Sequence, residues 1–164
     1  YPRGKGELRD WQNEMELLPI GRGRRLREGT DIAILTIGSI GNEAHKAILA
    51  AAAEGISVAH YDMIYLKPID EALLHEVGQK HSRIITVENG TIVGGLGTAV
   101  MEFMMEHGYT PRVRRIGIPD CFIQHGSIAD LYKLCGMDAA HILSAIRTLV
   151  GRTEEGHVEK GGQA

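Results

Sequence analysis

The sequence predicts an α/β fold in which a mostly parallel sheet lies between two layers of helices. Between residues 31 and 150, short apolar segments alternate with longer segments of helical spacing, the pattern of successive βαβ units. The apolar segments contain few polar residues, which is typical of strands buried on both faces. We therefore expect a three-layer α/β/α sandwich with right-handed crossovers.

The expected elements follow one another along the chain. Two short extended pieces, 17–21 and 24–27, precede the alternation and flank a glycine turn. Asp70 is expected to cap the second helix, and Gly55 to follow the end of the first. The expected strands cover 31–38, 56–62, 83–88 and 113–118, and the expected helices cover 42–54, a stretch from 70, a stretch opened by 94–97, 127–134 and 139–150.

Three regions are expected along the chain. Residues 1–14 are polar, with Pro2 and two nearby glycines, and are expected to be the remnant of an interdomain linker. Residues 15–150 are expected to form one α/β domain, and the Gly- and charge-rich residues 151–164 a flexible tail. The chain is therefore expected to begin within a connection of a longer protein.

Composition and charge exclude several classes of function. The 164 residues are 43% hydrophobic and 24% charged, with a net charge of −3, which disfavours nucleic acid as a partner. No apolar run approaches the roughly 18 residues of a membrane span, so no membrane partner is expected. Cys121 and Cys135 lie far apart in the sequence, which favours reduced thiols in a cytoplasmic protein.

Three patterns in the sequence are candidate sites. The loop 94–97, Gly-Gly-Leu-Gly, matches neither a P-loop nor a full dinucleotide fingerprint. We expect its glycines to serve the backbone turn and close helix packing, with ligand contact as the alternative. Cys121 and His125 are expected in a packed loop rather than as a catalytic dyad. The eight histidines have no metal-ligand spacing, so no metal site is expected, and most are expected at the surface or at helix ends.

Arg3 is the remaining candidate. The surrounding residues alone favour an exposed arginine in a linker. The alternative is a binding residue, because a guanidinium can hold a phosphate or carboxylate with two hydrogen bonds. The residues by themselves leave both interpretations open.

Five blocks of the sequence are distinctive: Tyr-Pro-Arg-Gly (1–4), 18–23, 61–71, 87–97 and Ile-Gly-Ile-Pro-Asp-Cys-Phe-Ile-Gln-His-Gly (116–126). Together they resemble the C-terminal third of the 1-deoxy-D-xylulose-5-phosphate synthase family. Their Lys-Pro-Ile-Asp (67–70) and Gly-Gly-Leu-Gly (94–97) motifs are shared more widely, with transketolases and 2-oxoacid dehydrogenase β chains. Ile64 stands where relatives often have arginine, so no ionic role is expected there.

This resemblance implies a transketolase C-terminal-domain-like fold and a parent enzyme with three α/β domains. The parent would condense pyruvate with D-glyceraldehyde 3-phosphate to 1-deoxy-D-xylulose 5-phosphate and CO2, a transferase reaction of the non-mevalonate isoprenoid and thiamine biosynthetic routes. Thiamine diphosphate and Mg2+ would be bound by domains outside this chain, so the chain would hold no catalytic, cofactor-binding or metal-binding residue. Arg3 would bind the substrate phosphate, and the domain would support a homodimer while being inactive alone.

Two alternatives stay open at this point. The first is the C-terminal domain of a transketolase or of a 2-oxoacid dehydrogenase β chain. The second, of another class, is a stand-alone flavodoxin-like module for nucleotide binding or protein interaction. The apolar segment 100–105, which contains three methionines, is expected near the dimer interface.

Overall fold

The computed structural model describes residues 17–151, which form five strands and five helices. The expected linker, Arg3 and all but the first residue of the expected tail lie outside the described residues. The elements are β1 (Arg24–Arg27), β2 (Ile32–Ile37), α1 (Gly41–Ala53), β3 (Val58–Asp62), α2 (Glu71–Lys80), β4 (Arg83–Thr91), α3 (Leu96–Glu106), β5 (Arg112–Ile118), α4 (Ile128–Leu134) and α5 (Ala139–Val150).

The strands form one mixed sheet in the order β1-β3-β2-β4-β5. Strands β2, β3, β4 and β5 are parallel, whereas β1 pairs antiparallel with β3 at the edge. The apolar run of β2 explains its central position, because all its residues except Ile37 are buried and only a strand covered on both faces can bury them. The predicted, mostly parallel sheet is confirmed.

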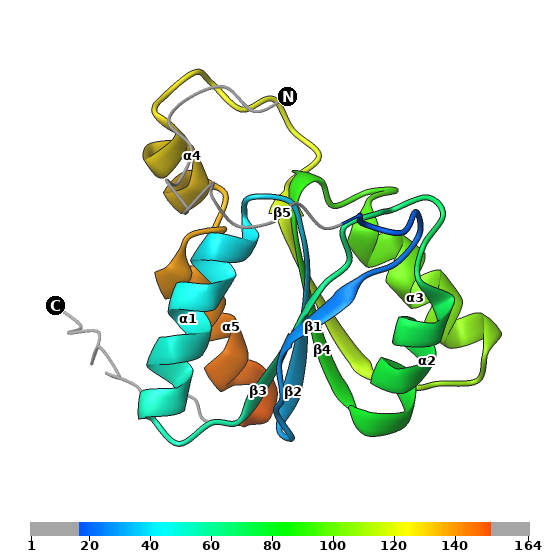
Figure 1. Cartoon of the computed structure of the whole chain (residues 1–164). Coiled ribbons are helices and arrows are strands. Elements are labelled where there is room, and N and C mark those ends of the chain that lie inside the picture. The colour runs from blue at the N-terminus through cyan, green and yellow to red at the C-terminus, as the bar shows by residue number, and fades with distance from the viewer. Residues whose placement is uncertain (1–16, 152–164) are drawn as a thin grey trace, which may run out of the picture.

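Helices cover both faces of the sheet (Figure 1). On one face, α1 and α5 enclose a core that includes Ile34, Ile85 and Ile146. On the other, α2 and α3 enclose a second core that includes Leu74 and Phe103. The three-layer sandwich predicted from the sequence is therefore confirmed.

Residues with special backbone roles fix the ends of the helices. The Asp70 side chain caps α2 by accepting a hydrogen bond from the Leu73 N–H at 3.0 Å. Gly55 follows α1 with a φ of 74°, a left-handed conformation that glycine adopts without strain. Both roles agree with the sequence prediction.

Three local expectations were wrong. Residues 17–21 contain a turn rather than a strand, with the Arg22 N–H donating to the Pro19 carbonyl at 3.2 Å. Strand β4 runs to Thr91, three residues beyond the expected end. The loop after β5 is exposed rather than packed, as Phe122 shows with a fully exposed ring. This loop and α4 project beyond the sheet (Figure 1).

Within residues 17–151, no helix combines the length and apolar character needed to cross a bilayer.

Candidate functional site

The motif residues gather at the carboxyl edge of the sheet. Parallel strands end at the same edge, so Asp62 at the end of β3, Glu88 near the end of β4 and Pro119 after β5 lie along it. In open α/β sheets ligands bind at the carboxyl ends of the strands. Three of the five blocks that carried the family resemblance, 61–71, 87–97 and 116–126, are therefore brought to one edge of the sheet by the topology.

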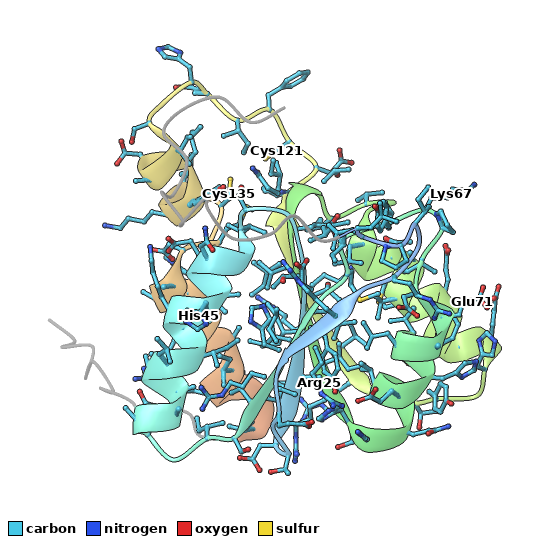
Figure 2. All side chains as sticks on the ribbon, viewed as in Figure 1. Arg25, His45, Lys67, Glu71, Cys121 and Cys135 are labelled. Atoms are coloured by element: carbon cyan, nitrogen blue, oxygen red, sulfur yellow. The ribbon has the colours of Figure 1, made fainter. Side chains whose placement is uncertain are left out.

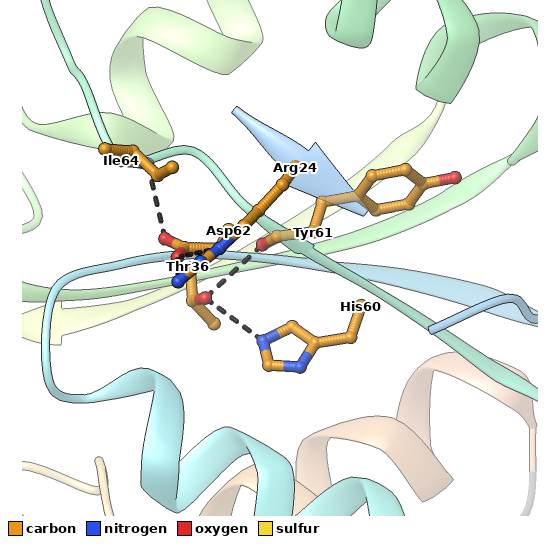
Figure 3. A network of polar contacts seen from close by, with 6 residues as sticks. All are labelled: Arg24, Thr36, His60, Tyr61, Asp62 and Ile64. Carbon is orange, nitrogen blue, oxygen red and sulfur yellow. Dashed lines mark hydrogen bonds and ion pairs between the residues drawn. The ribbon is translucent and has the colours of Figure 1, made fainter. Parts of the chain in front are cut away.

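Asp62 fixes the edge strand β1. Its Oδ2 accepts hydrogen bonds from Arg24 Nε and Nη2 at 3.1 and 3.0 Å, and its Oδ1 accepts one from the Ile64 N–H at 3.3 Å (Figure 3). A two-pronged arginine–carboxylate contact is more directional than a single ion pair. The hydrogen bonds between Arg24 and Asp62 thus stabilise the antiparallel pairing of β1 with β3.

Asp70 holds the segment just before β1. Its Oδ2 accepts the Gly23 N–H at 2.9 Å and its Oδ1 contacts Arg22 Nη1 at 3.4 Å, in addition to capping α2 through Leu73. The Asp70 side chain is buried, so these partners replace the water that a carboxylate would otherwise need. We call the contacts of Asp62 and Asp70 with residues 22–24 the aspartate clamp. The chain continues upstream from this clamp to Arg3.

Ile64 has an unusual backbone within the same motif. Its φ is 56°, a left-handed value that is rare for a β-branched residue and costs free energy. The neighbouring clamp residue Asp62 accepts its N–H, which helps to hold this conformation. No described ionic contact involves Ile64, as its apolar side chain dictates.

The glycine-rich loop meets a carboxylate of the same chain. Glu88 is buried and accepts the N–H groups of Leu96 and Gly97 at 2.7 and 2.9 Å. These amides form the N-terminus of α3, the end of a helix that favours an anion. Because Glu88 already occupies this position, the loop offers no free amide cradle to a diphosphate.

Close packing explains why the loop is rich in glycine. A Cβ on Gly95 would lie 2.0 Å from Glu88 Oε2 and 2.5 Å from the Thr91 carbonyl oxygen. A Cβ on Gly97 would lie 2.6 Å from Arg115 Cγ. The structural interpretation of the loop is thereby supported, and this loop does not fit the diphosphate of thiamine diphosphate.

A buried histidine beneath the clamp was missed at the sequence level. His60 lies on β3 with 2% of its surface exposed, and its Nε2 is 3.1 Å from the Thr36 hydroxyl (Figure 3). Since that hydroxyl donates to the Tyr61 carbonyl at 3.3 Å, it accepts from the His60 Nε2–H. Burial, reinforced by the charge of His45 and opposed by Asp62, lowers the pKa of His60 to about 4.

Most other histidines are exposed or lie at helix ends, as expected. His81 ends α2, although it is buried and its pKa is lowered, chiefly by burial. His60 departs from the expectation because it lies on a strand, not at an end. The predicted burial of strand 56–62 was the signal that could have identified it.

The remaining candidates do not form a reactive site within residues 17–151. Cys121 and His125 are both exposed on the projecting loop, and both cysteines are free thiols; Figure 2 shows Cys121 on that loop and Cys135 near the end of α4. No group of three or more histidine, cysteine or acidic residues in the described part could hold a metal ion.

The methionine-rich segment is mostly interior. Val100, Phe103 and Met104 of α3 are buried, whereas Met105 is 73% exposed. The apolar excess expected on the surface of this helix is therefore much smaller than the sequence suggested, because α2 and the sheet cover it.

Comparisons with known proteins agree with this geometry. Residues 21–142 match the family described as transketolase, C-terminal domain. The chain is 65% identical over 147 residues to 1-deoxy-D-xylulose-5-phosphate synthase of Parabacteroides distasonis, covering 90% of this chain and 23% of that protein. It is 59% identical over 139 residues to the synthase of Bacteroides thetaiotaomicron, covering 84% and 22%. The chain thus spans about a quarter of the length of these curated relatives.

Solved structures give the same fold. A split-gene transketolase, described as an inactive β4 tetramer, matches with a TM-score of 0.76 and 32% identity over 84% of this chain and 45% of that one. Transketolase of Leishmania mexicana matches with a TM-score of 0.57 and 17% identity over 82% of this chain and 18% of that one, which supports the fold alone. The chain therefore belongs to the transketolase C-terminal domain family.

Proposed function

We propose that the protein carrying this domain is a 1-deoxy-D-xylulose-5-phosphate synthase. It would condense pyruvate with D-glyceraldehyde 3-phosphate to 1-deoxy-D-xylulose 5-phosphate and CO2. The observation that carries the proposal is the 65% identity over 147 residues to the Parabacteroides distasonis enzyme of that name. The solved transketolases are more distant, at 32% and 17% identity, which favours the synthase over a transketolase.

Within that enzyme, the domain would position the segment that carries Arg3. The aspartate clamp holds residues 22–24, and Arg3 lies about twenty residues upstream in the sequence. In our proposal the Arg3 guanidinium binds the phosphate of D-glyceraldehyde 3-phosphate with paired hydrogen bonds. This contact would orient the acceptor aldehyde toward the reacting carbon.

Thiamine diphosphate and Mg2+ would be held by other parts of the enzyme. The helix N-terminus at the glycine-rich loop is occupied by Glu88, so this loop would not hold the cofactor's diphosphate. The isolated chain is accordingly expected to be inactive. We also propose a homodimer in the cytoplasm, which accords with the free thiols of both cysteines.

The test is product analysis with the full-length protein. The protein is incubated with thiamine diphosphate, Mg2+, pyruvate and D-glyceraldehyde 3-phosphate, and the sugar product is identified by NMR. We expect 1-deoxy-D-xylulose 5-phosphate and one CO2 per turnover. A parallel reaction uses a ketose phosphate donor in place of pyruvate. Ketol transfer from that donor without use of pyruvate would identify a transketolase and contradict the proposal.

A further inference from the structure

A groove runs along the outer side of β5, away from the aspartate clamp. It has a volume of about 520 Å3, within the range of small-molecule sites. One wall is β5, with Arg112, Arg114 and Ile116, and the other is α5, with His141, Ser144 and Thr148. None of the aspartate-clamp residues lines it, so the groove is independent of the function proposed above.

The strand alternation turns the two arginines toward α5. In the β4–β5 register, Arg114 is opposite Ile85 and Ile116 is opposite Val87. Ile85, Val87 and Ile116 all belong to the core beneath α1 and α5. Because side chains alternate along a strand, Arg112 and Arg114 lie on this face with Ile116. Arg115 also borders the groove, but its guanidinium is bonded to the Ile92 carbonyl and the Thr98 hydroxyl.

The helical wall presents polar groups at matching spacing. His141, Ser144, Ala145 and Thr148 recur at the three- and four-residue intervals that form one stripe of a helix. The His141 ring is held by a hydrogen bond with Asp138, and the Thr148 hydroxyl donates to the Ser144 carbonyl at 2.9 Å. Ile116, Ala145 and Leu149 supply apolar lining, which lowers the local dielectric and strengthens polar contacts.

The charge of this groove is not balanced by the described residues. Arg24, Arg25 and Arg147 each pair with a carboxylate, namely Asp62, Glu76 and Glu54. By contrast, no ion pair joins Arg112 or Arg114 to any carboxylate within residues 17–151, and no acidic residue is among those lining the groove. Two guanidinium groups without a carboxylate partner in the described residues form a local positive surface on a chain whose net charge is −3.

We infer that this groove binds a small phosphorylated ligand, held by Arg112 and Arg114 with Ser144 on the opposite wall. Guanidinium groups bind phosphate oxygens in pairs, and a hydroxyl supplies a further donor. The volume limits the ligand to a small molecule, and the two-arginine surface is too small for a nucleic acid backbone, which needs several cationic contacts.

The test measures protection of individual arginines from chemical modification. The full-length protein is treated with phenylglyoxal, which reacts with exposed guanidinium groups, in pyrophosphate or in sodium chloride of equal ionic strength. Mass spectrometry of the peptides gives the modification rate at each arginine. At a pyrophosphate concentration about ten times the dissociation constant, Arg112 and Arg114 should react about tenfold more slowly. Arg27, on the opposite edge strand, should react equally in both salts.

A matched pair of variants tests the geometry. Ser144→Asp places a negative charge on the opposite wall, so protection should require at least about tenfold more pyrophosphate. Ser144→Asn, of similar size but neutral, should keep the protection. The inference would be overturned if pyrophosphate protected Arg112 and Arg114 equally well in Ser144→Asp and in the wild type. It would also be overturned if the two arginines reacted at the same rate in sodium chloride as in pyrophosphate. Unreactive arginines without pyrophosphate would overturn it as well, because the groove would then be covered by another part of the protein. Each readout is local and independent of catalysis, so failure of the proposed enzymatic function would leave this test unaffected.

Discussion

His60 is a buried titratable side chain within the sheet. Its imidazole is 2% exposed and bonded to the Thr36 hydroxyl, an environment that disfavours the charged form. The groups around it act in opposite directions, since His45 lowers its pKa further and Asp62 raises it. The stability of the domain should consequently depend on the protonation of this one residue.

We predict that His60 destabilises the fold as the pH falls from about 6.5 to about 4. The pKa of His60 is about 4 in the folded state, against an ordinary value of 6.5, so the unfolded chain takes up a proton first. Over this window the loss is about 3 kcal/mol, at about 1.4 kcal/mol per pH unit. Above pH 6.5 the contribution is constant, and below pH 4 the slope from this residue ends.

Urea unfolding at pH 7, 5 and 4 measures this effect. His60→Gln should lose most of the slope, so the difference in unfolding free energy between wild type and variant should change by about 3 kcal/mol across the window. His125→Gln, on the exposed loop, should keep the wild-type slope. An identical pH profile for wild type and His60→Gln would show that His60 is not buried as a neutral group.

Arg3 is the residue on which the proposed substrate contact depends. In the full-length enzyme, Arg3→Ala should lower kcat/KM for D-glyceraldehyde 3-phosphate about 30-fold or more, since losing a charged partner costs roughly 2 kcal/mol or more. Arg3→Lys should recover part of the activity, because an ammonium cannot form the paired contact. Steady-state kinetics in both substrates give the answer.

The selectivity of the loss separates this role from a general one. In Arg3→Ala, kcat/KM for pyruvate, measured at saturating D-glyceraldehyde 3-phosphate, should change much less than kcat/KM for D-glyceraldehyde 3-phosphate. Lys5→Ala removes another cation from the same segment and should leave acceptor use near wild type. If kcat/KM fell equally for both substrates, or for neither, Arg3 would be an exposed linker residue without a role in phosphate binding.

At the scale of elements, Asp70 joins a helix to the segment preceding the edge strand. One carboxylate caps α2 through Leu73 and also holds Gly23 and Arg22. The sequence identified the cap, because aspartate before a helical pattern is a recognisable signal. It did not identify the contact with Gly23, which lies 47 residues away and is brought near by the pairing of β1 with β3.

We predict that Asp70→Ala lowers the free energy of unfolding by about 2–4 kcal/mol. Loss of the cap contributes about 1 kcal/mol, and the unpaired N–H of Gly23 adds about 1–3 kcal/mol. Asp70→Asn keeps an oxygen for the cap and should cost less. Chemical denaturation of the three proteins tests the order, and a loss in Asp70→Ala no larger than that in Asp70→Asn would exclude the double role.

At the scale of the whole molecule, one sheet supports two cores. The core under α1 and α5 and the core under α2 and α3 share the strands between them, because each buried strand sends alternate side chains to opposite faces. Neither core can form without the sheet. The described domain should therefore unfold as one cooperative unit rather than as two layers.

We predict a single calorimetric transition whose calorimetric and van't Hoff enthalpies agree. Ile85→Ala in one core and Leu74→Ala in the other, both fully buried, should each lower the unfolding free energy by about 2–5 kcal/mol. Each variant should shift the same transition. Two resolved transitions, only one of which moves in each variant, would contradict a shared core.

The layers, the parallel sheet, the order of most elements and two helix ends could be predicted from the sequence, because these features depend on local signals. Hydrophobic periodicity sets the type of each element, and residues such as Asp70 and Gly55 mark the helix ends. The motif blocks also determined the family, which the match over residues 21–142 supports.

Contacts between residues that are distant in the sequence could not be predicted in this way and are known from the three-dimensional structure. It placed Glu88 on the N-terminus of α3, where its carboxylate meets the amides of Leu96 and Gly97, and this contact explains the close packing of the glycine-rich loop. It turned Arg112 and Arg114 toward α5, and it buried His60 beside Thr36. Strand order and register set these contacts, and both are fixed by packing across the sheet rather than by any local pattern.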